Sequence, residues 1–285
     1  MNPIEQFYQP TYDIVGSMFK SNRMDILVLG AGYVGQAVAD KLHSDLGASV
    51  DLLTFGDDWT SDFSNYDVVI NCAAVTNTKT DLTLQQLDDM VVANLNIPLE
   101  MARSSHSDQH IIHVSTACLR PDVRDTRFSH DSPVLQAEGP YYATKLLAEA
   151  AIRKCSKSTI VRPRLIYDQS PTDKNMLVRL RKYSAALNCP QSVTCLHTLV
   201  AAICWMIYYR HDSGIKGCAD YDVVDRGDVA LNTIFDNENQ IECHESRAMP
   251  TKVADVQRQA LYDTGFTAID SKLAIDTCVK LLLQG

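Results

Sequence analysis

One stretch of the chain reads Met24-Asp25-Ile26-Leu27-Val28-Leu29-Gly30-Ala31-Gly32-Tyr33-Val34-Gly35-Gln36-Ala37-Val38-Ala39-Asp40-Lys41-Leu42. An apolar run leads into three glycines with the spacing G-x-G-x-x-G, and apolar residues then recur with helical spacing. The stretch therefore predicts a strand, a tight turn and a helix.

Each glycine has a physical role in such a turn. Gly30 permits the sharp reversal, Gly32 lets the backbone approach a pyrophosphate, and Gly35 lets the helix lie close to the strand. The helix then begins at Tyr33 and Val34 and offers unpaired N–H groups and a partial positive charge to phosphates. We expect these residues to bind a dinucleotide, although glycines at a strand-to-helix turn can also reflect close packing alone.

The composition excludes several classes of partner. Of the 285 residues, 46% are hydrophobic and 21% are charged, which is ordinary for a soluble enzyme. The net charge of -9 provides no basic field for nucleic acid or an anionic membrane, so we expect neither as a partner. No segment has the roughly 18 apolar residues that cross a bilayer. The N-terminus also lacks a signal peptide's basic and apolar segments, so we expect a cytoplasmic protein.

The cysteines and histidines show no metal-binding pattern. The nine cysteines lie in apolar segments without a C-x-x-C pair, which predicts reduced and mostly buried thiols. The eight histidines have no metal-ligand spacing. We therefore expect no metal site.

Strand and helix patterns alternate along the chain. We expect strands at 25–29, 47–55, 67–74, 110–116 and 158–163 and helices at 33–42, 82–104, 141–154, 199–209 and 255–283. Pro98 should kink or restart the helix in which it lies. The alternation predicts an α/β fold with a Rossmann-type, doubly wound parallel sheet and a smaller C-terminal substrate-binding region.

We divide the chain into an N-terminal extension at 1–23, a dinucleotide-binding Rossmann domain at 24–165, and a substrate-binding region at 166–285 that crosses back to the sheet. The extension carries Phe7, Tyr8, Tyr12 and Phe19. It is either a partly ordered tail or a segment whose aromatic residues dock on the body or on a second subunit.

The choice between NAD and NADP stays open. Thr54 occupies the position at the end of the second strand that should meet the adenosine ribose, where an acid favours NAD and a nearby arginine favours NADP. Asp57 and Asp58 follow closely. The small residues Ala73 and Ala74 end the next strand and are expected to lie against the cofactor.

Hydroxyl and amine side chains mark a candidate catalytic site. Tyr141 and Lys145 are four residues apart and share one helix face, 25 residues after a strand that ends in Ser115 and Thr116. Alternatively, Tyr141 is merely a buried tyrosine with a satisfied hydroxyl. The long polar loop at 120–139 is a candidate wall or lid for a substrate.

Together these motifs resemble the extended short-chain dehydrogenase/reductase family, especially its nucleotide-sugar epimerases and reductases. The resemblance runs from Met24 to the C-terminus and rests on the glycine turn, residues 69–74, Asn94, residues 113–116, Tyr141-x-x-x-Lys145 and residues 160–167. It implies that Thr116, Tyr141 and Lys145 are catalytic. It also implies a supporting role for Asn94 beside the cofactor and makes Ser115 the alternative hydroxyl, in contact with the substrate.

The chemistry of these groups suggests a mechanism. We expect the Lys145 ammonium and an oxidised nicotinamide to lower the pKa of Tyr141, which then exchanges a proton with a sugar oxygen while hydride passes between nicotinamide and carbon. Lys145 would also hold the nicotinamide ribose, and Thr116 would hydrogen-bond the reacting oxygen.

The sequence departs from the family pattern at two places, and the first of them narrows the range of expected reactions. Ala117 and Cys118 follow Thr116 where sugar dehydratases carry an Asp-Glu pair, so we do not expect dehydration. The glycine turn is also one residue shorter than the usual G-x-x-G-x-x-G.

Residues 175–182 and 190–194 look like segments of dTDP-4-dehydrorhamnose reductases. We name Arg164, Asn175, Arg179 and Arg247 as candidate substrate-binding residues. The arginines, together with Arg181, suit a sugar-nucleotide diphosphate, although each by itself can also be a solvated surface arginine. The sequence thus predicts an NAD(P)-dependent reductase of a nucleotide-linked keto sugar. A nucleotide-sugar epimerase that retains NAD is the first alternative, and a non-catalytic dinucleotide-binding regulator is the second. The resemblance also suggests a homodimer.

Overall fold

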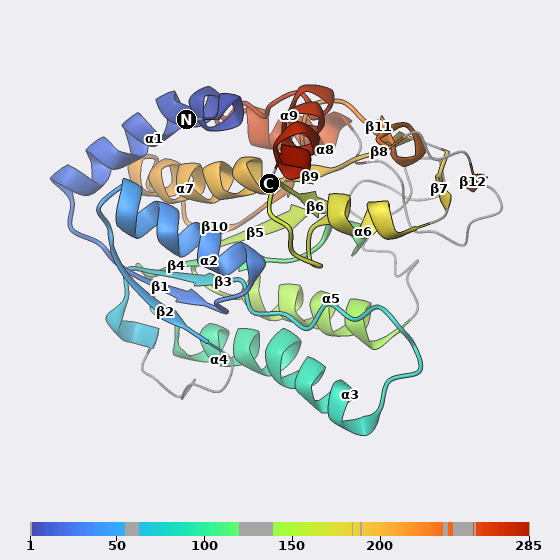
Figure 1. Cartoon of the computed structure of the whole chain (residues 1–285). Coiled ribbons are helices and arrows are strands. Elements are labelled where there is room, and N and C mark those ends of the chain that lie inside the picture. The colour runs from blue at the N-terminus through green and yellow to red at the C-terminus, as the bar shows by residue number, and fades with distance from the viewer. Residues whose placement is uncertain are drawn as a thin grey trace.

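The computed structural model describes residues 2–54, 63–119, 139–183, 185–188, 190–235, 239–241, 253 and 255–284. A parallel sheet of six strands lies at its centre (Figure 1). In spatial order the strands are β2 (Ser49–Leu53), β1 (Asp25–Leu29), β3 (Val68–Asn71), β4 (His110–Val114), β5 (Lys157–Pro163) and β10 (Gly217–Val223). The order reverses between β1 and β3, and a crevice forms at such a point beyond the carboxyl ends of the strands. The predicted α/β fold is confirmed.

Helices cover both faces of the sheet (Figure 1). One face carries α2 (Tyr33–Asp40) and α7 (Leu196–Asp212), and the other carries α3 (Leu84–Val91), α4 (Ile97–Ser104) and α5 (Pro140–Ile152). Successive strand residues point to opposite faces, so each layer receives alternate side chains. Ile26 of β1 belongs to the core under α2 and α7, and its neighbour Leu27 belongs to the core under α4 and α5.

The helical segment before β4 restarts next to Pro98, as expected. A π-helical turn at Val92–Asn96 follows α3, and α4 begins at Ile97, directly before Pro98. The Ile97 N–H bonds the Val92 carbonyl, and Pro98 lies in the first turn of α4, where its missing N–H costs nothing. The wider turn places Asn94 inside the fold, where it is fully buried.

The N-terminal extension forms α1 (Pro3–Ser21), which packs on α7 (Figure 1). Tyr8, Tyr12 and Phe19 are buried, whereas Phe7 stays 39% exposed. The Tyr8 hydroxyl donates to Thr198 Oγ1 at 2.8 Å and accepts from the Ile269 N–H at 3.0 Å. Of the two alternatives, the structure has the one in which the aromatic residues dock on the body.

The region after β5 contains short elements around the end of the sheet. They are β6 (Ile166–Tyr167), α6 (Met176–Lys182), β7 (Ala185–Leu187), β8 (Pro190–Gln191), β9 (Thr194–Cys195), β11 (Val229–Ala230), β12 (Asn239–Ile241), α8 (Asp255–Tyr262) and α9 (Ser271–Gln284). The helical pattern at 255–283 thus corresponds to two helices. Gly265 lies between them with φ +93°, a left-handed conformation that ends a helix.

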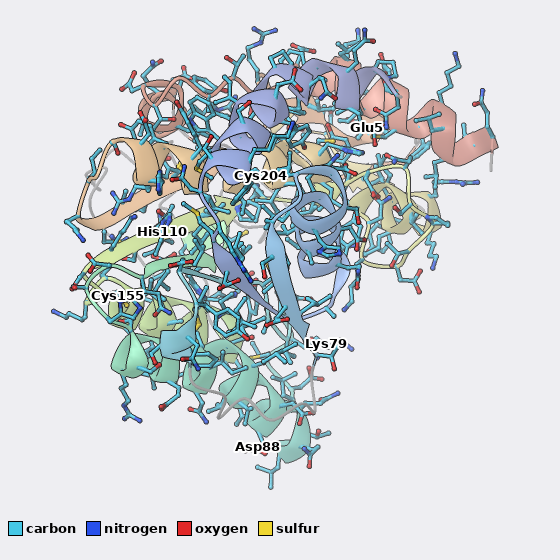
Figure 2. All side chains as sticks on the ribbon, turned by 90° about the vertical axis from the view of Figure 1, so that its left-hand side faces the viewer. Glu5, Lys79, Asp88, His110, Cys155 and Cys204 are labelled. Carbon is cyan, nitrogen blue, oxygen red and sulfur yellow. The ribbon has the colours of Figure 1, made fainter. Side chains whose placement is uncertain are left out.

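Seven cysteines lie in the described part of the chain, and all seven are free thiols. Figure 2 shows two buried ones, Cys204 in the α7 layer and Cys155 beyond the end of α5. Within the same residues, no group of His, Cys, Asp and Glu could hold a metal ion. No helix in the described ranges is both long and apolar enough to cross a membrane.

Candidate active site

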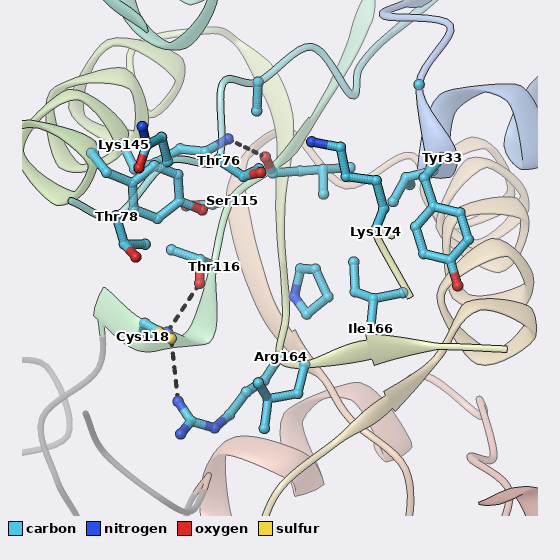
Figure 3. A pocket seen from close by; sticks show the side chains of 18 of the residues that line it. Tyr33, Thr76, Thr78, Ser115, Thr116, Cys118, Lys145, Arg164, Ile166 and Lys174 are labelled. Atoms are coloured by element: carbon cyan, nitrogen blue, oxygen red, sulfur yellow. Dashed lines mark hydrogen bonds between the residues drawn. The ribbon is translucent and has the colours of Figure 1, made fainter. Parts of the chain in front are cut away.

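A cavity of about 910 Å³ opens at the carboxyl ends of the central strands (Figure 3). It brings together ten residues that the sequence singled out, although they come from distant segments. They are Gly32, Tyr33, Val34, Ala74, Ser115, Thr116, Tyr141, Lys145, Arg164 and Arg179. Cavities of this size and position in α/β folds suit a cofactor together with a substrate.

The three glycines of the turn have different surroundings. A Cβ on Gly30 would lie 2.6 Å from the Ala73 Cα, and one on Gly35 would lie 1.9 Å from the Gly30 carbonyl oxygen. These two glycines, with Ala73 behind them, serve close packing of strand and helix and do not line the cavity. A Cβ on Gly32 would meet nothing within 4 Å, and Gly32 does line the cavity.

The turn therefore fits a dinucleotide phosphate. Gly32 is the N-cap of α2 and has no side chain to bind the first N–H groups of the helix. Those groups, with the helix dipole, suit an anion in the space that the absent Cβ leaves open. Gly32, Tyr33 and Val34 would hold it there.

The two hydroxyls that are predicted to be catalytic, those of Tyr141 and Thr116, lie on α5 and just beyond β4. Tyr141 is 9% exposed, and Thr116 Oγ1 accepts a hydrogen bond from the Cys118 N–H at 3.3 Å. Burial raises the pKa of Tyr141, Cys118 and Tyr142 add to this, and the Thr116 hydroxyl has a smaller opposite effect. The protein's own groups thus shift this pKa upward, opposite to the direction expected from Lys145 and an oxidised nicotinamide, because loss of water penalises the phenolate.

Lys145 is held at the end of β4. Its side chain is 2% exposed, and Nζ donates to the Val114 carbonyl at 2.9 Å. Burial lowers the pKa of Lys145 to about 8, although Glu149 and Cys72 act in the opposite direction. Glu149 in turn accepts two hydrogen bonds from Arg162, at 2.8 and 2.6 Å. Among the described residues, Glu149 is thus the carboxylate that acts on the Lys145 ammonium, and it is shared with Arg162.

Asn94 supports the cavity from behind. Its Oδ1 accepts from the Val75 N–H at 2.8 Å, and its Nδ2 donates to the Val75 carbonyl at 3.0 Å. Val75 lines the cavity, but Asn94 does not. The geometry gives Asn94 a positioning role, since the buried amide fixes the backbone that follows β3. Direct cofactor contact by Asn94 stays a prediction.

Other predicted residues lie away from the cavity wall. Thr54 is exposed just after β2, and Asn175 is fully buried, where it accepts from the Leu177 N–H at the start of α6 and donates to the Asp168 carbonyl at 2.7 Å. Because this amide is used inside the fold, Asn175 orders the loop before α6 and does not face a ligand. Arg247, Asp57, Asp58 and residues 120–138 lie outside the described residues.

The structure also adds residues that no motif indicated. Cys118, Tyr142, Lys174 and Gln191 line the cavity, and Arg164 joins two of them. Arg164 Nη1 donates to Cys118 Sγ at 3.2 Å, and Nη2 donates to Gln191 Oε1 at 3.0 Å. The Tyr33 hydroxyl donates to Asp168 Oδ1 at 2.7 Å and thereby ties the glycine turn to the loop after β6. In the sequence, Cys118 stands out only because it follows Ala117 where dehydratases carry an acidic pair, and Gln191 lies in the segment 190–194 that resembles the reductases. Neither signal assigns the residue to the cavity.

The chain is similar to known NAD-binding proteins. An NAD-binding family model described as male sterility protein matches residues 53–194. No curated protein sequence matches the chain.

Solved structures resemble nearly the whole chain. MoeE5 in complex with UDP-glucose and NAD is 16% identical, with a TM-score of 0.69 over 91% of this chain and 99% of that one. UDP-glucuronic acid 4-epimerase from Bacillus cereus, with UDP-glucuronic acid and NAD, is 14% identical, with a TM-score of 0.69 over 92% and 99%. dTDP-4-dehydrorhamnose reductase from Bacillus anthracis, with NADP, is 16% identical, with a TM-score of 0.66 over 93% and 100%. The resemblance indicated by the motifs is confirmed, and the chain has the fold of the extended short-chain dehydrogenases/reductases.

Proposed function

We propose that this protein is an NAD(P)-dependent oxidoreductase that reduces a keto group of a nucleotide-linked sugar. The observation that carries the proposal is the gathering of Thr116, Tyr141 and Lys145 with the open glycine turn in one cavity. The similar structures carry NAD or NADP, and two of them carry a nucleotide sugar. NAD or NADP is therefore the cofactor, supplying hydride to the keto carbon when bound.

The protein's own residues handle the proton. Thr116 donates a hydrogen bond to the keto oxygen, and Tyr141 delivers the proton that this oxygen gains as the carbon is reduced. The raised pKa of Tyr141 favours this direction, because the phenol keeps its proton at neutral pH and can act as a general acid. Lys145, on the same helix as Tyr141, holds its ammonium at the end of β4.

Two measurements test the proposal. The freshly purified protein is denatured, and any released nucleotide is identified by mass; oxidation of NADH and NADPH is then followed with a dTDP-linked 4-keto sugar. A reductase releases little nucleotide and consumes the reduced cofactor stoichiometrically. Near-stoichiometric NAD without net consumption contradicts the reductase assignment and favours the epimerase, which regenerates its cofactor. Cofactor binding without turnover of any sugar favours the non-catalytic alternative.

We also propose that two copies associate through α3 and α5. Leu84 of α3 and Leu147 of α5 are 87% and 54% exposed, whereas Met90 of α3 is fully buried within the subunit and cannot take part. Exposed leucines on neighbouring helices suit an apolar contact between subunits. A monomer in sedimentation experiments at micromolar concentration would contradict this association.

A further inference from the structure

Arg164 is a buried cation in the wall of the cavity. Its residue is 7% exposed and directly follows the end of β5. The next residue, Leu165, has φ +46°, a left-handed conformation that is costly for a residue with a Cβ. Backbone strain of this kind persists only where the surrounding structure enforces it. The strained turn here sends the chain away from the sheet just after Arg164.

The partners of Arg164 are neutral. The guanidinium donates to the Cys118 thiol and the Gln191 amide, and its buried Nε has no hydrogen-bond partner within the described ranges. No ion pair joins Arg164 to a carboxylate in the described part of the chain. Buried charges are normally paired, because loss of water is costly for an ion. A cavity-lining guanidinium with a free N–H therefore indicates an anionic ligand.

The position of Arg164 limits which anion this can be. Figure 3 shows Thr116, Cys118 and Arg164 joined in one chain of hydrogen bonds, with Lys174 and Tyr33 drawn away from it. Arg164 also lies close enough to Tyr142, the neighbour of Tyr141, to act on its pKa in the lowering direction. The guanidinium thus stands beside the catalytic hydroxyls, while Lys174 and Arg179 provide other cations in the cavity wall for a diphosphate.

We infer that the sugar carries a carboxylate and that Arg164 binds it, so that the substrate is a nucleotide-linked acidic sugar. The inference rests on the proposed function and sharpens its substrate class. A carboxylate attached next to the reacting carbon would lie beside Thr116 and Tyr141, whereas the diphosphate is attached at the anomeric carbon. A planar guanidinium carries five N–H donors and matches a carboxylate with two parallel hydrogen bonds.

The test compares two nucleotide sugars that differ in one group. Calorimetric titrations measure the affinity of the NAD-loaded protein for UDP-glucuronic acid and for UDP-glucose. We expect the wild type to prefer the acid by about tenfold or more, because charged hydrogen bonds are among the strongest. The variant Arg164→Gln should lose the preference, and Arg164→Lys should keep part of it. Arg103→Gln, which removes an exposed arginine on α4, is the matched control and should keep the full preference.

Several outcomes would overturn the inference. It is wrong if the wild type binds the two sugars with equal affinity, or if it binds neither sugar. Equal weakening of both sugars in Arg164→Gln would assign Arg164 to the shared diphosphate. If circular dichroism shows that Arg164→Gln is unfolded, the test uses Arg164→Lys instead. A ratio of the two sugar affinities that stays at the wild-type value in Arg164→Lys would contradict a paired contact between the guanidinium and a carboxylate. Binding of the cofactor and of both sugars without preference would refute the acidic sugar alone, whereas failure of both NAD and NADP to bind would refute the proposed function itself.

Discussion

The cavity has two walls that the chain builds in different ways. We call the first the motif wall, which consists of Ser115, Thr116, Tyr141 and Lys145. We call the second the arginine wall, which consists of Arg164, Arg179 and Gln191. The motif wall comes from one strand end and one helix, so short sequence spacing is enough to create it. The arginine wall comes from three separate segments, and its geometry depends on contacts between them.

Two arginines on either side of the end of β5 show what this difference means. Arg162 lies within the strand, bonds Glu149 in two places and reaches Asp220 at 2.6 Å. The guanidinium of Arg164, two residues later, hydrogen-bonds only a thiol and an amide side chain in the described structure. Charge neutralised inside the protein serves the fold, and charge left without a counterion beside a cavity is available to a ligand.

The largest expected effect concerns the motif wall. Tyr141→Phe removes the proton donor and keeps the ring, so turnover of a keto sugar should fall by about 10²–10⁴-fold. Steady-state rates measure the loss, and titration with NAD should show nearly unchanged affinity. Tyr66→Phe, which alters a half-buried tyrosine bonded to Asp51 away from the cavity, is the matched control and should keep full turnover. Full activity of Tyr141→Phe would show that the hydroxyl of Tyr141 is not the proton donor.

The second prediction separates the two arginines by stability. Arg162→Gln should lower the free energy of unfolding by about 3–5 kcal/mol, because Glu149 then stays buried without its counterion. Arg164→Gln should change it by about 1 kcal/mol or less. Urea unfolding at pH 7 measures both.

The same ion pair predicts a dependence on pH. Burial alone would raise the pKa of Glu149, but Arg162 brings it below its ordinary value. The stabilising contribution of Glu149 is therefore present above the ordinary carboxyl pKa and is lost as pH falls through the lowered pKa.

The comparison of the two arginine variants can also fail. Equal losses of stability in Arg162→Gln and Arg164→Gln would contradict the distinction between an arginine that stabilises the fold and an arginine that binds a ligand.

The third prediction concerns the glycine turn that adjoins the motif wall. Gly35→Ala places a Cβ 1.9 Å from the Gly30 carbonyl oxygen, so α2 must shift and the free energy of unfolding should fall by about 1–3 kcal/mol. Gly32→Ala meets nothing within 4 Å and should leave stability unchanged. It should still weaken NAD binding by about tenfold, because the methyl group enters the space that a phosphate would use. Thermal unfolding and NAD titration distinguish the pair, and unaltered NAD affinity in Gly32→Ala would place the phosphate elsewhere.

The smallest effect is a pH dependence from Lys145. Its pKa in the folded protein is about 8 against an ordinary 10.5, so kcat/KM for the dinucleotide should fall as pH rises through about 8. Between these two values the unfolded chain binds more protons than the native protein, so this group makes the free energy of unfolding rise with pH. A loss of activity with rising pH, without a loss of stability, would thus assign the decline to deprotonation of Lys145. Lys145→Arg, which keeps its charge, should lack this alkaline decline, and a decline that persists in this variant would assign it to another group.

Much of the motif wall could be predicted because its residues are close in sequence or follow strands. The glycine turn, the strand ends at Ala74 and Thr116, and the Tyr141–Lys145 pair each need only a local pattern. The sequence did not reveal the inward place of Asn94, since the π-helical turn before Pro98 depends on how α3 and α4 meet α5. The direction of the Tyr141 pKa shift also escaped prediction, because it follows from burial by residues distant in sequence.

Local patterns were sufficient for the parallel sheet, the turn at Gly30 to Gly35 and the helix that carries Tyr141 and Lys145, because strand alternation, helix periodicity and glycine conformations act over a few residues. Long-range packing alone placed α1 on α7, joined Arg164 to Cys118 and Gln191, and gave the Arg164 guanidinium no carboxylate partner among the described residues. The physical reason is that solvation and ion pairing depend on which distant segments exclude water from a group, and no spacing along the chain records this.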